Sequence, residues 1–226
     1  MSTSDKPRRR PERPRVLLTG FDPFGGATLN PSWLAVQALH GRQVQGHTLV
    51  AAQLPTVFGE ALRVLHALLA KHRPALVVCV GQAGGRAAIS LERVAINVDD
   101  APIADNAGVQ PLDAPVAPGA PAAYFSTLPI KAALAALQRE GLRAEVSQTA
   151  GTFVCNHVFY GLMHALATRP GLRRVRGGFV HLPWLPEQGT PCMPLDDMVV
   201  GLRLIVRTAL GAGVAAAPSL HAGTTH

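Results

Sequence analysis

The stretch SQTAGTFVCNH, residues 147–157, followed by VFYGLMHAL, residues 158–166, determines how the rest of the chain is arranged. It begins as a short strand, turns at Gly151 and continues with apolar residues three and four positions apart. That spacing predicts a helix with one buried face that starts at or near Cys155. A helix N-terminus favours an anion, so we expect a thiol there to lose its proton more easily than usual.

Cys155 has two interpretations. A lone cysteine is most often a small buried hydrophobic residue. The glycine at position 151, however, permits a sharp turn and the close approach of a substrate, which a purely structural cysteine does not need. We therefore take Cys155 as a candidate nucleophile. Cys79 lies inside the continuous apolar run 76–81 and is predicted to be a core residue.

Predicted strands and helices alternate on both sides of this stretch. Apolar or β-branched runs predict strands at residues 15–20, 44–52, 76–81, 89–98, 144–147 and 178–183. Helical spacing predicts helices beginning near 31 and over 57–72, 129–141 and 195–210, with Asn30 and Thr56 as N-caps of the first two. This alternation predicts an α/β protein: a three-layer α/β/α sandwich with a mostly parallel twisted sheet, as in phosphorylase-like and hydrolase-like folds.

Ligands of such sheets bind beyond the carboxyl ends of the strands. Four residues stand at predicted strand ends and are expected to converge on one edge: Gly20, Gly81, Thr149 and His181. The loop after the first strand holds Phe21 and Phe24, although a Pro/Gly turn offers little core to bury aromatic rings. These rings either fold back as a lid on the core or line a pocket.

Composition favours one soluble domain. The chain has 226 residues, of which 48% are hydrophobic and 15% charged, and no apolar run approaches the roughly 20 residues that cross a bilayer. The basic N-terminus is not followed by an apolar signal region, so we expect no membrane association and residence in the cytoplasm. Three cysteines without CxxC spacing disfavour a disulfide framework and a zinc site, and no metal or cofactor is expected.

The net charge of +7 is unevenly distributed, since residues 1–15 contribute +4 of it. We predict a disordered basic tail at 1–14, a single α/β/α domain at 15–212 and a flexible C-terminal tail at 213–226. The alternative function of the basic tail is a weak contact with a polyanion. The body of the chain is only mildly basic, so nucleic acid is not expected as a partner.

A thiol nucleophile needs a base, and usually a third group that orients the base. Among nine histidines, His181 alone ends an apolar strand, where it can meet Cys155 across the sheet edge. Glu92 stands among apolar residues, where a carboxylate is costly to bury unless it is paired. On the residues alone, its partner is either His181 or a structural arginine such as Arg86.

Four blocks of the sequence resemble the pyroglutamyl-peptidase I (pyrrolidone-carboxylate peptidase) family of cysteine exopeptidases. They are LLTGFDPFGG (17–26) with NPS (30–32), GQAGGR (81–86) with ISLERVAIN (89–97), TAGTFVCN (149–156), and GFVHLP (178–183) with LPEQ (185–188). Their order and spacing agree over about residues 15–210. The chain departs from the family at Pro102 and Ala104, where arginine and proline are usual, which concerns the shape of that loop and not the catalytic residues.

The resemblance implies hydrolysis of the amide bond after an N-terminal pyroglutamate, with no metal or cofactor. Cys155 is the implied nucleophile, His181 the general acid and base, and Glu92 the residue that orients His181. The implied substrate is a peptide with an N-terminal pyroglutamate, and a homo-oligomer, either a dimer or a tetramer, is expected.

Pyroglutamate is a neutral lactam, so its pocket should combine apolar walls with a few polar partners. By similarity to the family, the walls are Phe21, Phe24, Phe153 and Val154. Gln82 and Asn30 are candidates for lactam contacts or for support of the loops.

Two other functions are compatible with parts of the sequence. A phosphorolytic nucleoside-processing enzyme has a similar architecture, but it would need clustered Arg and Gly and no reactive thiol. A catalytically inactive homologue or polyanion-binding protein would use the basic tail. It predicts an inert Cys155 and salt-sensitive binding that is lost when residues 1–15 are deleted.

Overall fold

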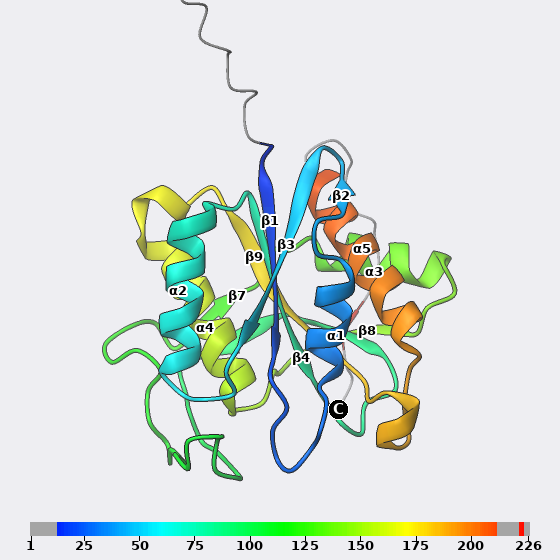
Figure 1. Ribbon diagram of the computed structural model, residues 1–226. Helices are drawn as coiled ribbons and strands as arrows, with labels where there is room; N and C mark the ends of the chain where they lie inside the picture. Colours follow the sequence, from blue (N-terminus) through cyan, green and yellow to red (C-terminus); the bar gives the residue numbers. More distant parts are fainter. Residues whose placement is uncertain (1–12, 212–221, 224–226) are drawn as a thin grey trace, which may run out of the picture.

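The computed structural model describes residues 13–211, 222 and 223. Seven strands form its central sheet, in the order β2 (Gln43–Val44), β3 (His47–Leu54), β1 (Arg15–Phe21), β4 (Leu76–Gln82), β9 (Arg176–Leu182), β5 (Ile89–Glu92) and β8 (Ala144–Ser147). Helices α2 (Glu60–His72) and α4 (Val154–Thr168) cover one face, and α1 (Pro31–Ala38), α3 (Ile130–Arg139) and α5 (Leu195–Gly211) cover the other (Figure 1). The predicted three-layer α/β/α sandwich is confirmed.

The four central strands β3, β1, β4 and β9 run parallel, whereas β5 runs antiparallel to β9, and β8 follows β5. The sheet is therefore mostly parallel, as predicted. Gly20, Gly81 and His181 lie at or near the carboxyl ends of parallel strands, but Thr149 follows β8, which runs the other way. The strand before Thr149 points away from this edge, because β8 pairs with a reversed strand, but the loop that follows returns to it and brings the Cys155 sulfur beside Gly81.

Alternate residues of the strands divide the core into two layers, since successive side chains of a strand point to opposite faces. Val16, Val78 and Val180 belong to the cluster under α1, α3 and α5. Cys79 and Phe179 belong to the cluster under α2 and α4 and are 0% exposed, which confirms Cys79 as a core residue. By the same alternation, His181 and Gly81 face the α4 side of the sheet.

The predicted strand at 89–98 is two strands in two sheets. After β5, the backbone N–H of Arg93 still bonds the Ser147 carbonyl at 2.9 Å, and the chain then leaves the central sheet. The following strand, β6 (Val94–Ile96), pairs antiparallel with β7 (Ala123–Phe125). This second sheet contacts α4.

Two capping predictions had different outcomes. Asn30 caps α1 as predicted, because its Oδ1 accepts the Ser32 backbone N–H at 3.0 Å. Thr56 does not cap α2, which begins three residues later than predicted. Its hydroxyl donates instead to the Asp22 carbonyl at 3.2 Å, and Gly59 occupies the cap position with a φ of 71°.

The long segment 99–121 is an ordered loop, as predicted. The Asp105 carboxylate accepts backbone N–H groups of Phe58, Ala107 and Val109 at 2.8 Å each. The side chain of Asn106 donates to the Pro23 carbonyl at 2.9 Å, which joins this loop to the aromatic loop after β1.

The predictions of a disordered tail at 1–14 and of a flexible tail at 213–226 fall almost entirely outside the described residues. Two short 3-10 turns, η1 (Pro170–Leu172) and η2 (Pro186–Gln188), complete the described elements. Within that part of the chain, every helix is too short or too polar to span a membrane.

Gly20 lets β1 pack directly against the backbone of α1. A Cβ placed there would lie 2.6 Å from the Ser32 carbonyl carbon and oxygen and from the Trp33 Cα. Backbone atoms cannot rotate away, so we expect Gly20→Ala to lower the free energy of unfolding by about 1–3 kcal/mol. Gly171→Ala is the control, since nothing lies within 4 Å of its Cβ position. Chemical denaturation measures the free energy of unfolding of both variants. Equal values for the two would contradict this account of the packing.

Candidate active site

Cys155 is the second residue of α4, so its predicted place at a helix N-terminus is confirmed. The next residue, Asn156, fixes this end of the helix. It is 0% exposed, its Oδ1 accepts the Ile96 N–H at 3.1 Å, and its Nδ2 donates to the carbonyls of Ile96 and Val98 at 2.9 Å. These bonds hold the start of α4 against β6 and the residues that follow it.

His157 provides a second anchor for the start of α4. Its Nε2 accepts the Gly59 backbone N–H at 3.0 Å, and its Nδ1 lies 2.8 Å from Oδ2 of Asp99. Because a backbone N–H can only donate, Nε2 carries no proton and Nδ1 donates to Asp99. Both ring nitrogens are engaged, so His157 positions the helix and has no nitrogen available as a base.

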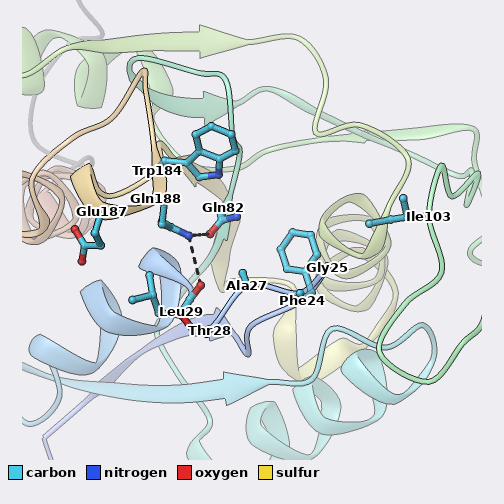
Figure 2. Close-up of a pocket in the computed structure, with 11 residues that line it drawn as sticks. Phe24, Gly25, Ala27, Thr28, Leu29, Gln82, Ile103, Trp184, Glu187 and Gln188 are labelled. Atoms are coloured by element: carbon cyan, nitrogen blue, oxygen red, sulfur yellow. Dashed lines mark hydrogen bonds between the residues drawn. The ribbon is translucent and has the colours of Figure 1, made fainter.

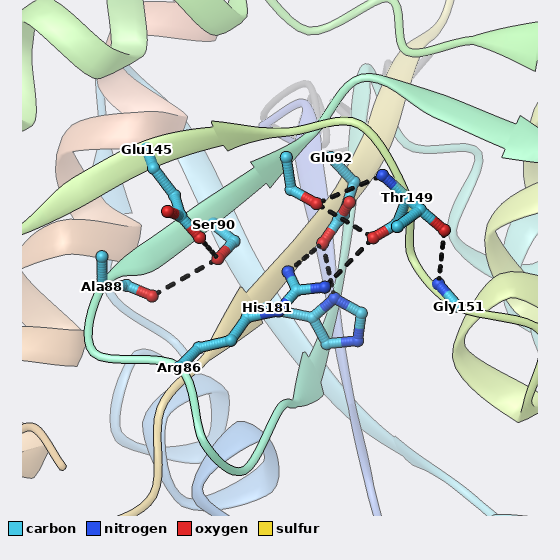
Figure 3. A network of polar contacts seen from close by, with 9 residues as sticks. Arg86, Ala88, Ser90, Glu92, Glu145, Thr149, Gly151 and His181 are labelled. Carbon is cyan, nitrogen blue, oxygen red and sulfur yellow. Dashed lines mark hydrogen bonds and ion pairs between the residues drawn. The ribbon is translucent and has the colours of Figure 1, made fainter. Parts of the chain in front are cut away.

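The predicted pair of Glu92 and His181 is present (Figure 3). The Nδ1 of His181 lies 2.7 Å from Oε1 of Glu92, and the two residues are 4% and 0% exposed. Ionised carboxylates only accept hydrogen bonds, so Nδ1 carries the imidazole proton. That tautomer leaves Nε2 as a proton acceptor.

Arg86 contacts the same carboxylate oxygen. Its Nη1 donates to Oε1 of Glu92 at 2.7 Å, and its Nη2 donates to the Thr149 carbonyl at 3.1 Å (Figure 3). The two partners considered for Glu92 are therefore both present. Oε2 of Glu92 is buried and has no hydrogen-bond partner among the described residues. Arg86 thus supplies a positive charge beside a buried carboxylate and ties it to the turn that precedes α4.

The thiol of Cys155 lies above Gly81 of β4. A Cβ at Gly81 would be 2.8 Å from the sulfur, and Gly81 is the register partner of His181. The missing side chain at position 81 therefore makes room for the thiol beside the strand that carries the base. This convergence joins Cys155, His181 and Glu92 in one site.

The expectation of an acidic thiol at Cys155 is wrong. Burial raises its pKa to about 12, the charge of Glu92 raises it further, and Arg86 opposes the shift. Removal from water disfavours the thiolate more strongly than the start of the helix favours it. A reaction at this sulfur therefore needs a base to take the proton of the thiol.

A cavity of about 680 Å³ lies beside this site (Figure 2). It is lined by Phe24, Gly25, Gly26, Ala27, Thr28, Leu29, Gln82, Ile103, Trp184, Glu187 and Gln188. Gln82 directly follows Gly81, and the Phe24 ring packs against Phe153 with centroids 5.9 Å apart. The cavity therefore borders the end of β4, and one of its walls, Phe24, contacts the residue that precedes α4.

The six predicted pocket residues divide into two sets. Phe24 and Gln82 are partly exposed and line the cavity, and Phe153 is partly exposed and packs against Phe24. Phe21 and Val154 are 2% and 0% exposed and belong to the core layer beneath α4. Asn30 is 2% exposed and is committed to the loop, since it caps α1 and donates to the Asp22 carbonyl at 3.0 Å.

Several residues of the site did not follow from sequence reasoning. Asn156 and His157 gave one usable signal, because they are polar residues beside the nucleophile in an otherwise apolar helix. Gln188 belongs to the LPEQ block of the resemblance, but the block does not predict its contacts, and Trp184 gave no signal, since a Pro-rich turn does not predict which side chains face a cavity. Within residues 13–211, no three His, Cys, Asp or Glu side chains are grouped closely enough to hold a metal ion.

The charge of Arg86 can be tested through the reactivity of the thiol. Because Arg86 opposes the rise in the pKa of Cys155, we expect Arg86→Gln to raise that pKa further. At a pH below the pKa of a thiol, each unit by which the pKa rises lowers the thiolate fraction about tenfold. Alkylation of Arg86→Gln by iodoacetamide should therefore be about two- to tenfold slower between pH 7 and 9. A Cys192→Ser background limits labelling to Cys155, and Arg143→Gln is the matched control. Unchanged alkylation in Arg86→Gln would refute the assigned effect.

Comparison with known proteins agrees with this site. The family model described as pyroglutamyl peptidase matches residues 14–212. Pyrrolidone-carboxylate peptidase 1 of Ralstonia nicotianae is 59% identical over 202 residues, which are 87% of this chain and 93% of that protein. The pyrrolidone-carboxylate peptidase of Klebsiella pneumoniae is 55% identical over 216 residues, which are 93% of this chain and 99% of that protein.

A solved structure matches this chain in both fold and sequence. The crystal structure of pyroglutamyl peptidase I from Bacillus amyloliquefaciens superposes with a TM-score of 0.85 at 48% identity, and the match covers 88% of this chain and 98% of that one. With a family model that spans nearly all of the described residues and relatives above 50% identity, the chain belongs to the pyroglutamyl peptidase family of cysteine-type hydrolases.

Proposed function

We propose that this chain removes an N-terminal pyroglutamate from peptides by hydrolysing the amide bond that follows it. Cys155 acts as the nucleophile, His181 as the general base and acid, and Glu92 as the residue that orients His181. The observation that carries the proposal is the buried Glu92–His181 hydrogen bond beside Gly81, above which the Cys155 sulfur lies. The names of the relatives support the choice of reaction.

The first half of the reaction forms a thioester. Nε2 of His181 takes the proton of the Cys155 thiol as the sulfur attacks the pyroglutamyl carbonyl carbon. Because burial raises the pKa of the thiol, we assign this proton transfer to the attack itself. The C–N bond then breaks, the proton on Nε2 passes to the leaving amine, and the shortened peptide departs.

The second half consumes water. Nε2 of His181 takes a proton from a water molecule, whose oxygen attacks the thioester carbonyl. The C–S bond breaks, the proton returns to sulfur, and free pyroglutamate leaves. Throughout, Glu92 balances the charge of the imidazolium, while Arg86 donates a second hydrogen bond to the same carboxylate.

Each tetrahedral intermediate carries an oxyanion that needs fixed donors. The first N–H groups of α4 have no partner within the helix, and they lie on the same turn as the sulfur. We assign the oxyanion to these groups together with N–H groups of the glycine-rich loop 82–86.

The lactam occupies the part of the cavity nearest Cys155. Phe24 and Phe153 supply apolar walls, and Gln82 supplies a polar partner at the end of β4. None of these three side chains is charged, which suits a neutral ring. Phe21 and Val154 support these walls from the layer below.

We also propose that the catalytic domain spans residues 15–212 and works in the cytoplasm, where its three free cysteines, Cys79, Cys155 and Cys192, stay reduced. A homo-oligomer, either a dimer or a tetramer, would cover large apolar side chains that are exposed in one chain, such as Leu112 at 83% and Phe125 at 71%. Light scattering should give a mass of two or four chains, and a monomer at micromolar concentration would overturn this part of the proposal.

The reaction is tested by release of a fluorophore from a pyroglutamyl amide, beside a prolyl amide that lacks the lactam carbonyl. We expect turnover of the pyroglutamyl substrate alone, and its loss after alkylation of the protein. Folded protein that shows no turnover in reducing buffer would refute the activity and favour an inactive homologue that acts through its basic tail.

Variants assign the roles. Cys155→Ser and His181→Ala should each lower kcat by at least about a thousandfold, because each removes a group that bonds or carries the transferred proton. Glu92→Gln should be slower but measurably active. Cys79→Ser and Cys192→Ser are controls that should keep their activity, since neither residue belongs to the site. Normal turnover by Cys155→Ser would refute the mechanism.

A further inference from the structure

Gln188 belongs to the LPEQ motif, which the proposed reaction does not use. It is the last residue of η2, and all of the hydrogen-bonding groups of its side-chain amide face protein partners. Its Oε1 accepts the Leu185 backbone N–H at 3.0 Å. Its Nε2 donates to the Leu29 carbonyl at 3.4 Å and to Oε1 of Gln82 at 3.0 Å (Figure 2).

Two of these partners fix the orientation of the Gln188 amide. A backbone N–H can only donate and a backbone carbonyl can only accept, so Leu185 must face the oxygen of Gln188 and Leu29 must face its nitrogen. If the Gln188 amide rotated by 180°, its NH₂ group would face the Leu185 N–H, a second donor. Its oxygen would face the Leu29 carbonyl, a second acceptor. The second hydrogen on Nε2 therefore always points at Gln82.

This orientation is passed on to Gln82. A hydrogen from Gln188 requires an acceptor, so the oxygen of Gln82 is turned towards Gln188. The NH₂ group of Gln82 then lies on the side away from Gln188 (Figure 2). No described residue accepts a hydrogen bond from it, and Gln82 lines the cavity beside Gly81. The side chain of Gln82 therefore presents its two N–H donors to the cavity. If its amide could rotate freely, it would present either these donors or its oxygen.

We propose that Gln188 is a positioning residue that makes the cavity selective for a neutral carbonyl acceptor, by holding the NH₂ group of Gln82 towards the ligand. This rests on the proposed function for its ligand class, a lactam or amide carbonyl beside Cys155. Gln188 does not touch the ligand and acts through Gln82 alone.

A purely structural role for Gln188, as the cap of its own turn through Leu185, makes different predictions. Gln188→Glu keeps an acceptor for the Leu185 N–H but has no hydrogen for Gln82. The Gln82 amide must then turn its NH₂ group to the new carboxylate and its oxygen to the cavity. Gln188→Leu removes the cap and lets Gln82 rotate freely. A cap role makes Gln188→Leu the worse variant, whereas the positioning role makes Gln188→Glu the worse one.

The experiment measures inhibition and direct binding of 2-pyrrolidinone, together with KM and kcat on a pyroglutamyl amide. Because the probe is neutral, a new charge at position 188 has little direct effect on its binding. We expect Gln188→Glu to weaken 2-pyrrolidinone and raise KM by about 10- to 100-fold, with kcat changed by less than about twofold. Gln188→Leu should weaken binding only about twofold, because the Gln82 amide would then present its NH₂ group to the cavity about half of the time. Gln37→Glu, the same change at an exposed position of α1, is the control and should match the unmodified protein.

Gln82→Glu provides a second test if Gln188→Glu does not fold. It leaves Gln188 and its turn intact, presents an oxygen to the cavity and should weaken the lactam to a similar extent. Unchanged lactam affinity in Gln188→Glu, or in Gln82→Glu, overturns the inference, as does a loss of affinity that is greater in Gln188→Leu. Lactam binding with this pattern but no peptide hydrolysis would refute the proposed function and leave the inference standing.

Discussion

The arrangement of the site depends on one buried carboxylate. Glu92 has no exposed surface, so its charge must be balanced within the protein. His181 and Arg86 both donate to its Oε1, and each bond is 2.7 Å long. The first bond selects the imidazole tautomer, and the second ties the carboxylate through Thr149 to the turn before α4. A single oxygen thus links the base, the charge balance and the segment that carries the nucleophile.

The rest of the fold places the Cys155 thiol beside the strand next to His181. Parallel strands bring Gly81 and His181 side by side, and the absence of a side chain at Gly81 leaves space for sulfur. Asn156 and His157 hold the start of α4 from the opposite side. The surroundings of the thiol also raise its pKa, so the proposed reaction needs a base to take the proton.

The sequence predicted the layers and most of the elements from periodicity and strand ends. It made Cys155, His181 and Glu92 candidates, and the family resemblance joined them as one proposed site. It failed where the outcome depends on contacts distant along the chain. The helix α2 begins later than predicted because Thr56 donates to Asp22. The segment 89–98 forms two strands and not one because β6 pairs with β7. The pKa of Cys155 was predicted with the wrong sign, since a helix start is visible in a sequence but the depth of burial is not. Gln188 was visible as part of a motif, yet its effect on Gln82 exists only in three dimensions.

The reversed strand β5 means that the two parts of the proposed site are held by different contacts. Glu92 and His181 lie on two hydrogen-bonded strands, so strand pairing sets the distance between carboxylate and imidazole. Cys155 is attached differently, through a helix whose start is bound to β6 and to the loop at Asp99. The proposed site therefore combines a charge pair built into the sheet with a sulfur whose position is set by contacts outside the sheet.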